Sequence, residues 1–203
     1  SCNPDSEGTL CYSGCGITAM NMVLEYFDIP ADNWYFFRTD GDDKCFRKEG
    51  YSMDELVKFA QSKNIDAVPL SLDDFDSPWD ELIKATRDGL VIMRQSQLVR
   101  NNDGEIVDGI CTPHDLVERN YCVEGHYIVI IYADDDFVIA NDPYTGVSGK
   151  KEFGHNIVLS RSQLEKAWDQ RDNQMIKIGG RSYDPDLDPF KEVLVKNQKQ
   201  NWV

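Results

Sequence analysis

The stretch YSGCGITAMNMVLEYF, residues 12–27, opens the first periodic segment of this chain of 203 residues. Ser13 stands where a helix N-cap is expected, and Pro30 ends the segment. Apolar side chains recur along it at the spacing of one helix face: Ile17, Met20, Val23, Leu24 and Phe27. The pattern predicts an amphipathic helix over residues 16–27, directly after Cys15.

Cys15 has a setting that suits a nucleophile. A thiol at a helix N-terminus feels the positive end of the peptide dipoles, which favours the thiolate. The flanking Gly14 and Gly16 permit a tight turn and the close approach of a substrate backbone. The backbone N–H of Cys15 can also help to hold an oxyanion. Taken alone, the segment fits a structural cysteine beside turn glycines equally well.

A second segment, HYIVIIYADDDFVIAND, predicts a β-hairpin over residues 126–142 with its turn at residues 134–136. His126 begins the outgoing strand, and Asp142 follows the returning one. Antiparallel pairing brings these two residues together, and the alternation of side chains turns the neighbouring Asn141 to the other face.

Cys15, His126 and Asp142 together supply a nucleophile, a base and a group that orients the base. Each of them has a structural explanation when it is considered alone. The combination predicts an active site for acyl transfer.

The rest of the chain places helices first and strands later. A capping box, Ser52 with Glu55, begins a helix over residues 52–63, and Pro78 lies in the first turn of a helix that ends at Gly89. Further expected elements are a loop with aromatic and charged residues over 31–50, strands over 67–72, 90–99 and 173–180, a loop over 107–122 and a helix over 162–169. This order predicts an α+β fold, with the first helix packed on a mostly antiparallel sheet. We expect one domain over residues 1–180 and a C-terminal extension over residues 181–203.

The composition restricts the partners. The formal net charge is −15, which disfavours nucleic acid and an anionic membrane surface but suits a neutral or basic peptide. No run of eighteen apolar residues predicts a membrane-spanning helix. Six cysteines favour an oxidising compartment, so we expect a secreted or extracytoplasmic protein, with lipid anchoring through Cys2 as a weaker idea and a cytoplasmic location as the alternative.

Three segments resemble the bacteriocin-processing, double-glycine leader peptidases and their secreted papain-like relatives. They are GCGITAMNMVLEYFDI, GHYIVIIYADDDFVIANDPYTG and SQLEKAWDQRDNQMIKIG, and the resemblance extends over about residues 9–178. It implies a papain-like α+β fold with Cys15 as nucleophile, His126 as general base and acid, and Asp142 as the residue that orients His126. The expected substrate is a peptide or protein, and no metal or organic cofactor is needed.

One position departs from the pattern of that family. Its members carry a Gln about six residues before the cysteine, which donates to the oxyanion, whereas this chain has Thr9 there and no Gln before Gln61. Thr9, Ser13 or Asn3 could donate instead. Since one such donor is worth about two to three orders of magnitude in rate, three functions stay open. They are a cysteine peptidase, a glutamine deamidase or acyl transferase with the same acyl-enzyme, and an inactive module that binds peptides.

Other reactive residues have plainer interpretations. His114 lies between Cys111 and Cys122, and these two cysteines are candidate disulfide partners that the sequence cannot settle. The acidic clusters predict solvated turns, because none of them matches the calcium-loop pattern.

Overall fold

The computed structural model describes residues 15–29, 38–39, 42–46, 51–95, 98–100, 106–110, 126–143, 156–168 and 174–179, with the backbone alone at 38–39, 42–46, 98–100 and 106–110. The helices in this part of the chain are α2 (Cys15–Tyr26), α3 (Met53–Ser62), the short 3-10 helix η2 (Leu72–Asp74), α4 (Pro78–Asp88) and α6 (Arg161–Trp168). The strands are β1 (Arg38–Thr39), β2 (Asp42–Phe46), β3 (Ala67–Ser71), β4 (Gly89–Gln95), β5 (Leu98–Arg100), β6 (Ile106–Ile110), β7 (His126–Ala133), β8 (Phe137–Asn141), β9 (Ile157–Ser160) and β10 (Gln174–Gly179).

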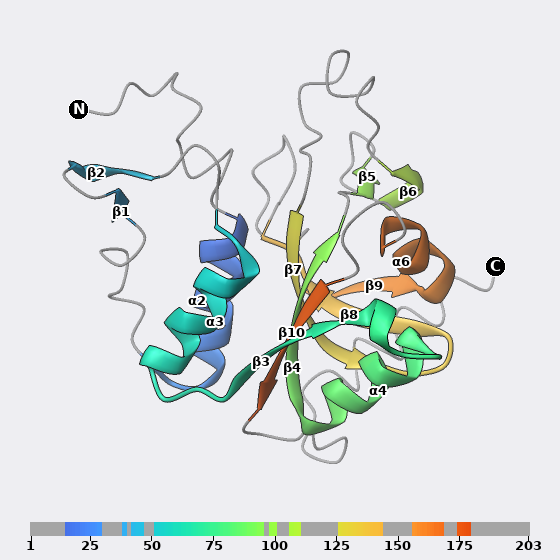
Figure 1. Ribbon diagram of the computed structural model, residues 1–203. Coiled ribbons are helices and arrows are strands. Elements are labelled where there is room, and N and C mark those ends of the chain that lie inside the picture. Colours follow the sequence, from blue (N-terminus) through green and yellow to red (C-terminus); the bar gives the residue numbers. More distant parts are fainter. Residues whose placement is uncertain are drawn as a thin grey trace.

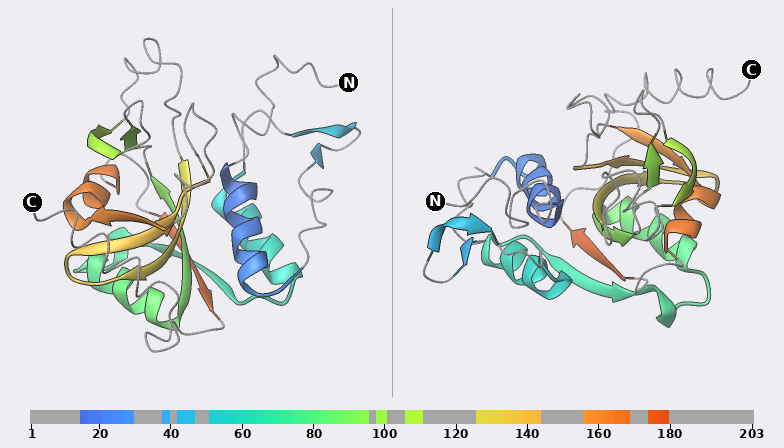
Figure 2. Two further views of the ribbon diagram at one scale, coloured as in Figure 1. Left: turned by 180° about the vertical axis from the view of Figure 1, so that it is seen from behind. Right: turned by 90° about the horizontal axis from the view of Figure 1, so that it is seen from above.

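A six-stranded sheet forms the centre of the described part, in the order β3-β10-β4-β7-β8-β9. Every neighbouring pair in it is antiparallel. Helices α2 and α3 lie on one side of the sheet, and α4 and α6 lie on the other (Figures 1 and 2). The predicted α+β class is therefore confirmed. None of the helices in the described residues is long and apolar enough to span a membrane.

The first helix packs on the sheet through the face that the periodicity predicted. Ile17, Met20, Val23 and Leu24 are fully buried. They belong to a core that also takes in α3 and one face of the sheet, including Val129. The capping box is present as expected: the Ser52 side chain accepts from the Glu55 N–H, and the Glu55 side chain accepts from the Ser52 N–H. This packing fixes the N-terminal end of α2 against the start of β7.

A second core fills the other side of the sheet, below α4 and α6. Its largest side chains are two tryptophans, Trp79 and Trp168, whose rings meet edge to face with centroids 5.7 Å apart. The indole N–H of Trp168 donates to the sulfur of Met93 on β4. The sheet is therefore covered on both faces, which explains why β4 and β7 are apolar along nearly their whole length.

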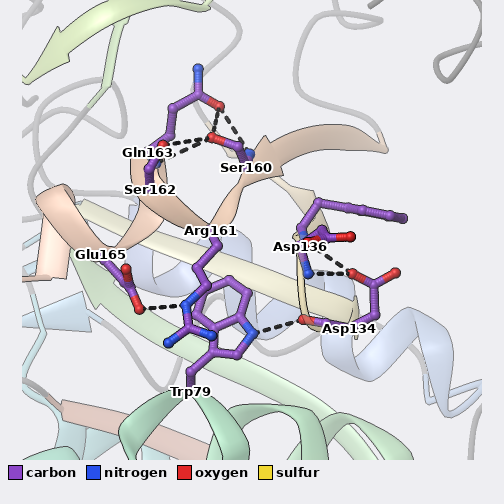
Figure 3. A network of polar contacts seen from close by, with 9 residues as sticks. Trp79, Asp134, Asp136, Ser160, Arg161, Ser162, Gln163 and Glu165 are labelled. Carbon is purple, nitrogen blue, oxygen red and sulfur yellow. Dashed lines mark hydrogen bonds and ion pairs between the residues drawn. The ribbon is translucent and has the colours of Figure 1, made fainter.

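A polar network fixes the turn of the β7–β8 hairpin (Figure 3). The carboxylate of Asp134 accepts from the Asp136 N–H at 2.9 Å, and its backbone carbonyl accepts from Trp79 Nε1 at 2.7 Å. The backbone N–H of Arg161 donates to the carbonyl of Asp136, while the Arg161 guanidinium bonds Glu165 and lies over the Trp79 ring. This network joins the turn to α4 and α6, and so it fixes the register of the two strands.

Several predicted boundaries need correction. The single strand expected over residues 90–99 is wrong: β4 ends at Gln95, and β5 pairs with β6 in a separate two-stranded sheet. The loops expected over 31–50 and 107–122 contain β1, β2 and part of β6. β9 was not predicted. These strands are short and contain Asp, Lys or Gly, or lack polar alternation, so the local pattern does not mark them.

Candidate active site

Cys15 is the first residue of α2 and is half-buried. The N–H groups of the first helical turn have no acceptor within the helix and carry the positive end of its dipole. The backbone N–H groups of Gly16 and Tyr127 both help to lower the pKa of the Cys15 thiol. The thiol therefore lies where the backbone stabilises negative charge.

His126 begins β7 and is 1% exposed, and its ring contacts both other members of the predicted constellation. Nε2 lies 2.5 Å from the Oδ1 atom of Asp142. The Cys15 side chain also acts on His126 and helps to raise the pKa of the imidazole. The structure therefore brings together the three residues that the sequence analysis selected, from α2, β7 and the end of β8.

The β7–β8 hairpin explains how Asp142 reaches His126. Val129 pairs with Asn141, and a register shift lies between residues 130 and 132. Asp142 follows directly and is 6% exposed, so its carboxylate faces the imidazole out of contact with bulk water. Burial strengthens a charge-assisted hydrogen bond of this kind, because less water competes for it.

The electrostatics of the site favour the charged forms of both Cys15 and His126. Burial alone would lower the pKa of His126, but the charge and hydrogen bond of Asp142, together with Cys15, raise the pKa of His126 to about 10. Burial would likewise raise the pKa of the Cys15 thiol. The hydrogen bond and charge of His126 outweigh it, so the pKa of Cys15 lies below its ordinary value. Both shifts favour a thiolate at Cys15 beside an imidazolium at His126.

The end of β8 is anchored by a contact that the sequence did not indicate. The side-chain oxygen of Asn141 accepts from the backbone N–H of Asn156 at 2.8 Å. Asn156 begins the approach to β9 with a φ of 51°, a left-handed conformation that Asn tolerates better than most residues. Because Asn141 directly precedes Asp142, this bond holds the carboxylate in place.

Tyr127 connects the two sides of the site. Its hydroxyl donates to the carbonyl of Tyr51 at 2.9 Å, next to the start of α3. Its ring lies against Gly16, where an added Cβ would approach Tyr127 Cδ2 to 3.3 Å. Glycine at position 16 therefore lets α2 lie close to β7, which brings Cys15 to His126.

Some predicted residues cannot be placed. The oxyanion candidates Thr9, Ser13 and Asn3 lie outside the described residues, as do Cys2, His114 and the candidate pair Cys111 and Cys122. The extension over residues 181–203 lies outside them too. Within the ranges that the structure describes, no three His, Cys, Asp or Glu side chains are grouped so that they could hold a metal ion.

A family model described as the Peptidase_C39 like family matches residues 3–176. The chain belongs to this family. The resemblance drawn from the three sequence segments is thereby confirmed. Membership supports a cysteine peptidase-like function for this C39-like protein. No curated protein matches the chain.

Two solved structures are similar to this C39-like protein. A putative C39-like peptidase from Bacillus anthracis is 22% identical, with a TM-score of 0.51 over 84% of this chain and 90% of that chain. The peptidase domain of Streptococcus ComA, a bi-functional ABC transporter involved in a quorum sensing pathway, is 13% identical, with a TM-score of 0.46 over 83% of this chain and 93% of that chain. The first likeness confirms the predicted papain-like α+β fold.

Proposed function

We propose that this protein is a cysteine peptidase that cleaves peptide bonds through Cys15, His126 and Asp142. The observation that carries the proposal is the buried contact of His126 with Asp142 on one side and Cys15 on the other. Family membership supports the class of activity. The assignment of the three residues is our own.

The reaction would begin with the Cys15 thiolate. It attacks the carbonyl carbon of the scissile bond, and the backbone N–H of Cys15 donates to the oxyanion that forms. His126 then donates its proton to the leaving amine, and the carbon–nitrogen bond breaks to leave a thioester on Cys15.

Hydrolysis of the thioester completes the cycle. His126, now neutral, takes a proton from water, which attacks the thioester carbonyl and releases the new carboxyl terminus and the thiolate. Asp142 keeps the imidazole in one orientation and stabilises its charged form throughout. The net charge of −15 favours peptides of neutral or basic composition.

The test is a digestion of a mixed peptide library in water enriched in oxygen-18, read by mass spectrometry. We expect new carboxyl termini that carry the heavy oxygen in the presence of the protein, and none with Cys15→Ala or His126→Ala. Asp135→Asn, at the exposed end of the hairpin, serves as the control and should retain activity.

Two other outcomes would replace the proposal. Release of ammonia from glutamine side chains without chain cleavage would identify a deamidase, the alternative that the absent N-terminal Gln favours. Peptide binding without any covalent change, equal in the protein and in Cys15→Ala, would identify a binding module.

A further inference from the structure

Three of the five buried polar residues in the described part of the chain lie at the ends of neighbouring strands. They are Gln95 and His126, each 1% exposed, and Asp142 at 6%. Gln95 ends β4, His126 begins β7 and Asp142 follows β8, and these strands are neighbours in the sheet. Gln95 has no role in the mechanism given above.

Gln95 lies directly across from His126. The two are Cα partners in the β4–β7 pairing, so their side chains are neighbours on one face of the sheet. Met93, two residues before Gln95, and Ile128, two residues after His126, both belong to the core below α4. Since β8 pairs with the other edge of β7, Gln95 flanks the imidazole on the side away from Asp142.

The amide of Gln95 is an exception on an apolar face. Its Oε1 atom is buried and accepts no hydrogen bond from the described residues. The indole N–H of Trp168, which reaches the same face, donates to Met93. A buried acceptor without a donor costs free energy that an apolar side chain of the same shape would not. This cost indicates that the Gln95 amide has a functional role, and its neighbour His126 is where that role would act.

We propose that Gln95 is a second positioning residue for His126, which confines the imidazole from β4 while Asp142 holds it from the end of β8. The inference rests on the proposed function, because it assigns Gln95 a purpose only if Cys15 and His126 act as a pair. The amide packs along the ring and limits its rotation. Its oxygen also adds the negative end of a dipole near the imidazolium.

Among the residues that the structure describes, Asp142 and Cys15 are the ionisable groups that act on His126. Arg94, next to Gln95 on β4, lies on the opposite face of the sheet by the alternation of side chains. A neutral amide at position 95 can therefore restrain the orientation of the His126 ring without adding a third charge beside it.

The experiment compares the full chain with Gln95→Met and Gln95→Glu. The readout is the rate of Cys15 alkylation by iodoacetamide as a function of pH, measured residue by residue by mass spectrometry, with the thermal midpoint alongside. Met93→Leu, on the same strand and the same face, is the control for repacking. Gln95→Leu applies the same test if Gln95→Met does not fold.

Gln95→Met should raise the pH of half-maximal alkylation by about one unit while leaving the thermal midpoint unchanged or higher. Gln95→Glu keeps an acceptor oxygen and should hold the alkylation rate at pH 6 within about threefold, and Met93→Leu should not shift the profile. A Gln95→Met profile that superimposes on the original overturns the role of Gln95 and leaves the proposed function standing. If Cys15 in the unchanged protein reacts like an ordinary thiol, both proposals fall together.

Discussion

The Nε2 atom of His126 lies 2.5 Å from the Oδ1 atom of Asp142, although the two are sixteen positions apart in the chain. Both side chains are buried, so the carboxylate and the imidazole compensate each other's loss of water. This contact raises the pKa of His126. An imidazolium that persists at neutral pH can in turn stabilise the thiolate of Cys15.

Cys15 should react as a thiolate well below the pH range of an ordinary cysteine. The lowered pKa of Cys15 predicts that half-maximal alkylation by iodoacetamide occurs below the free-thiol value of about 8.5. Because His126 is a main cause of that lowering, His126→Ala should slow alkylation at pH 6 by about tenfold or more. Half-maximal alkylation near pH 8.5 in both proteins would contradict the ion pair.

Asp142→Asn removes the charge of the Asp142 side chain and keeps its shape. An amide in this place can still accept a hydrogen bond but no longer stabilises the imidazolium, and burial then dominates. The pKa of His126 should fall from about 10 to below its ordinary value of about 6.5. An NMR titration of the ring measures this, and Asp135→Asn serves as control. An unchanged His126 titration would show that another group carries the charge.

The shifted pKa values of His126 and Cys15 predict how the stability of the protein depends on pH. The folded pKa of His126 is raised, so its contribution is complete below about pH 6.5 and is lost as the pH rises through about 10. The lowered pKa of Cys15 works the other way, because its contribution is complete above about pH 8.5 and is lost as the pH falls. A comparison of the unfolding free energy at pH 8.5 with that at pH 10.5 therefore isolates the contribution of His126.

Urea unfolding at these two pH values measures the contribution. The unfolding free energy of the unchanged protein should exceed that of Asp142→Asn at pH 8.5, and this difference should shrink by about 2 kcal/mol at pH 10.5. Glu165→Gln removes the carboxylate of the exposed pair with Arg161, and its difference from the protein should be equal at both pH values. An advantage over Asp142→Asn that grows with pH would mean that the sign assigned to His126 is wrong.

The parts of the site that the sequence predicted are those encoded locally. The face of α2 follows from its own periodicity, and the meeting of His126 with Asp142 follows from one hairpin and its turn. Gln95 was not found, because its neighbour His126 is reached only through the β4–β7 pairing, and the thirty residues between them give no signal of register. Tyr127 was missed for a similar reason, since an apolar strand does not show which of its rings touches a helix.

Two glycines at strand ends make a matched pair for testing the packing of the sheet. A Cβ at Gly89 would lie 2.0 Å from the backbone oxygen of Ile178, whereas one at Gly179 would meet the exposed side chain of Asp66 at 3.0 Å. Backbone in the centre of the sheet cannot move aside, but a surface carboxylate can rotate. Gly89→Ala should cost about 3 kcal/mol or more, and Gly179→Ala about 1 kcal/mol or less. Equal losses in urea unfolding would contradict the assigned clash.

Gly16→Ala tests the close approach of α2 to β7. The added methyl group would crowd the ring of Tyr127, which cannot yield easily because its hydroxyl is bonded to Tyr51. We expect a loss of about 1 kcal/mol in unfolding free energy. The alkylation profile of Cys15 should also move to higher pH, because the Tyr127 N–H that helps to lower the pKa of the thiol is displaced.

A double-mutant cycle with Tyr127→Phe isolates this effect. Without the hydroxyl, the ring can shift by a few tenths of an ångström, and the better helix propensity of Ala over Gly, worth about 1 kcal/mol, can then appear. Gly16→Ala should therefore be less damaging in the Tyr127→Phe background than in the unchanged protein, with a coupling of at least about 0.5 kcal/mol. Equal costs in the two backgrounds would show that the Tyr127 hydroxyl does not hold the ring against α2, and that the spacing between Cys15 and His126 is set by other contacts.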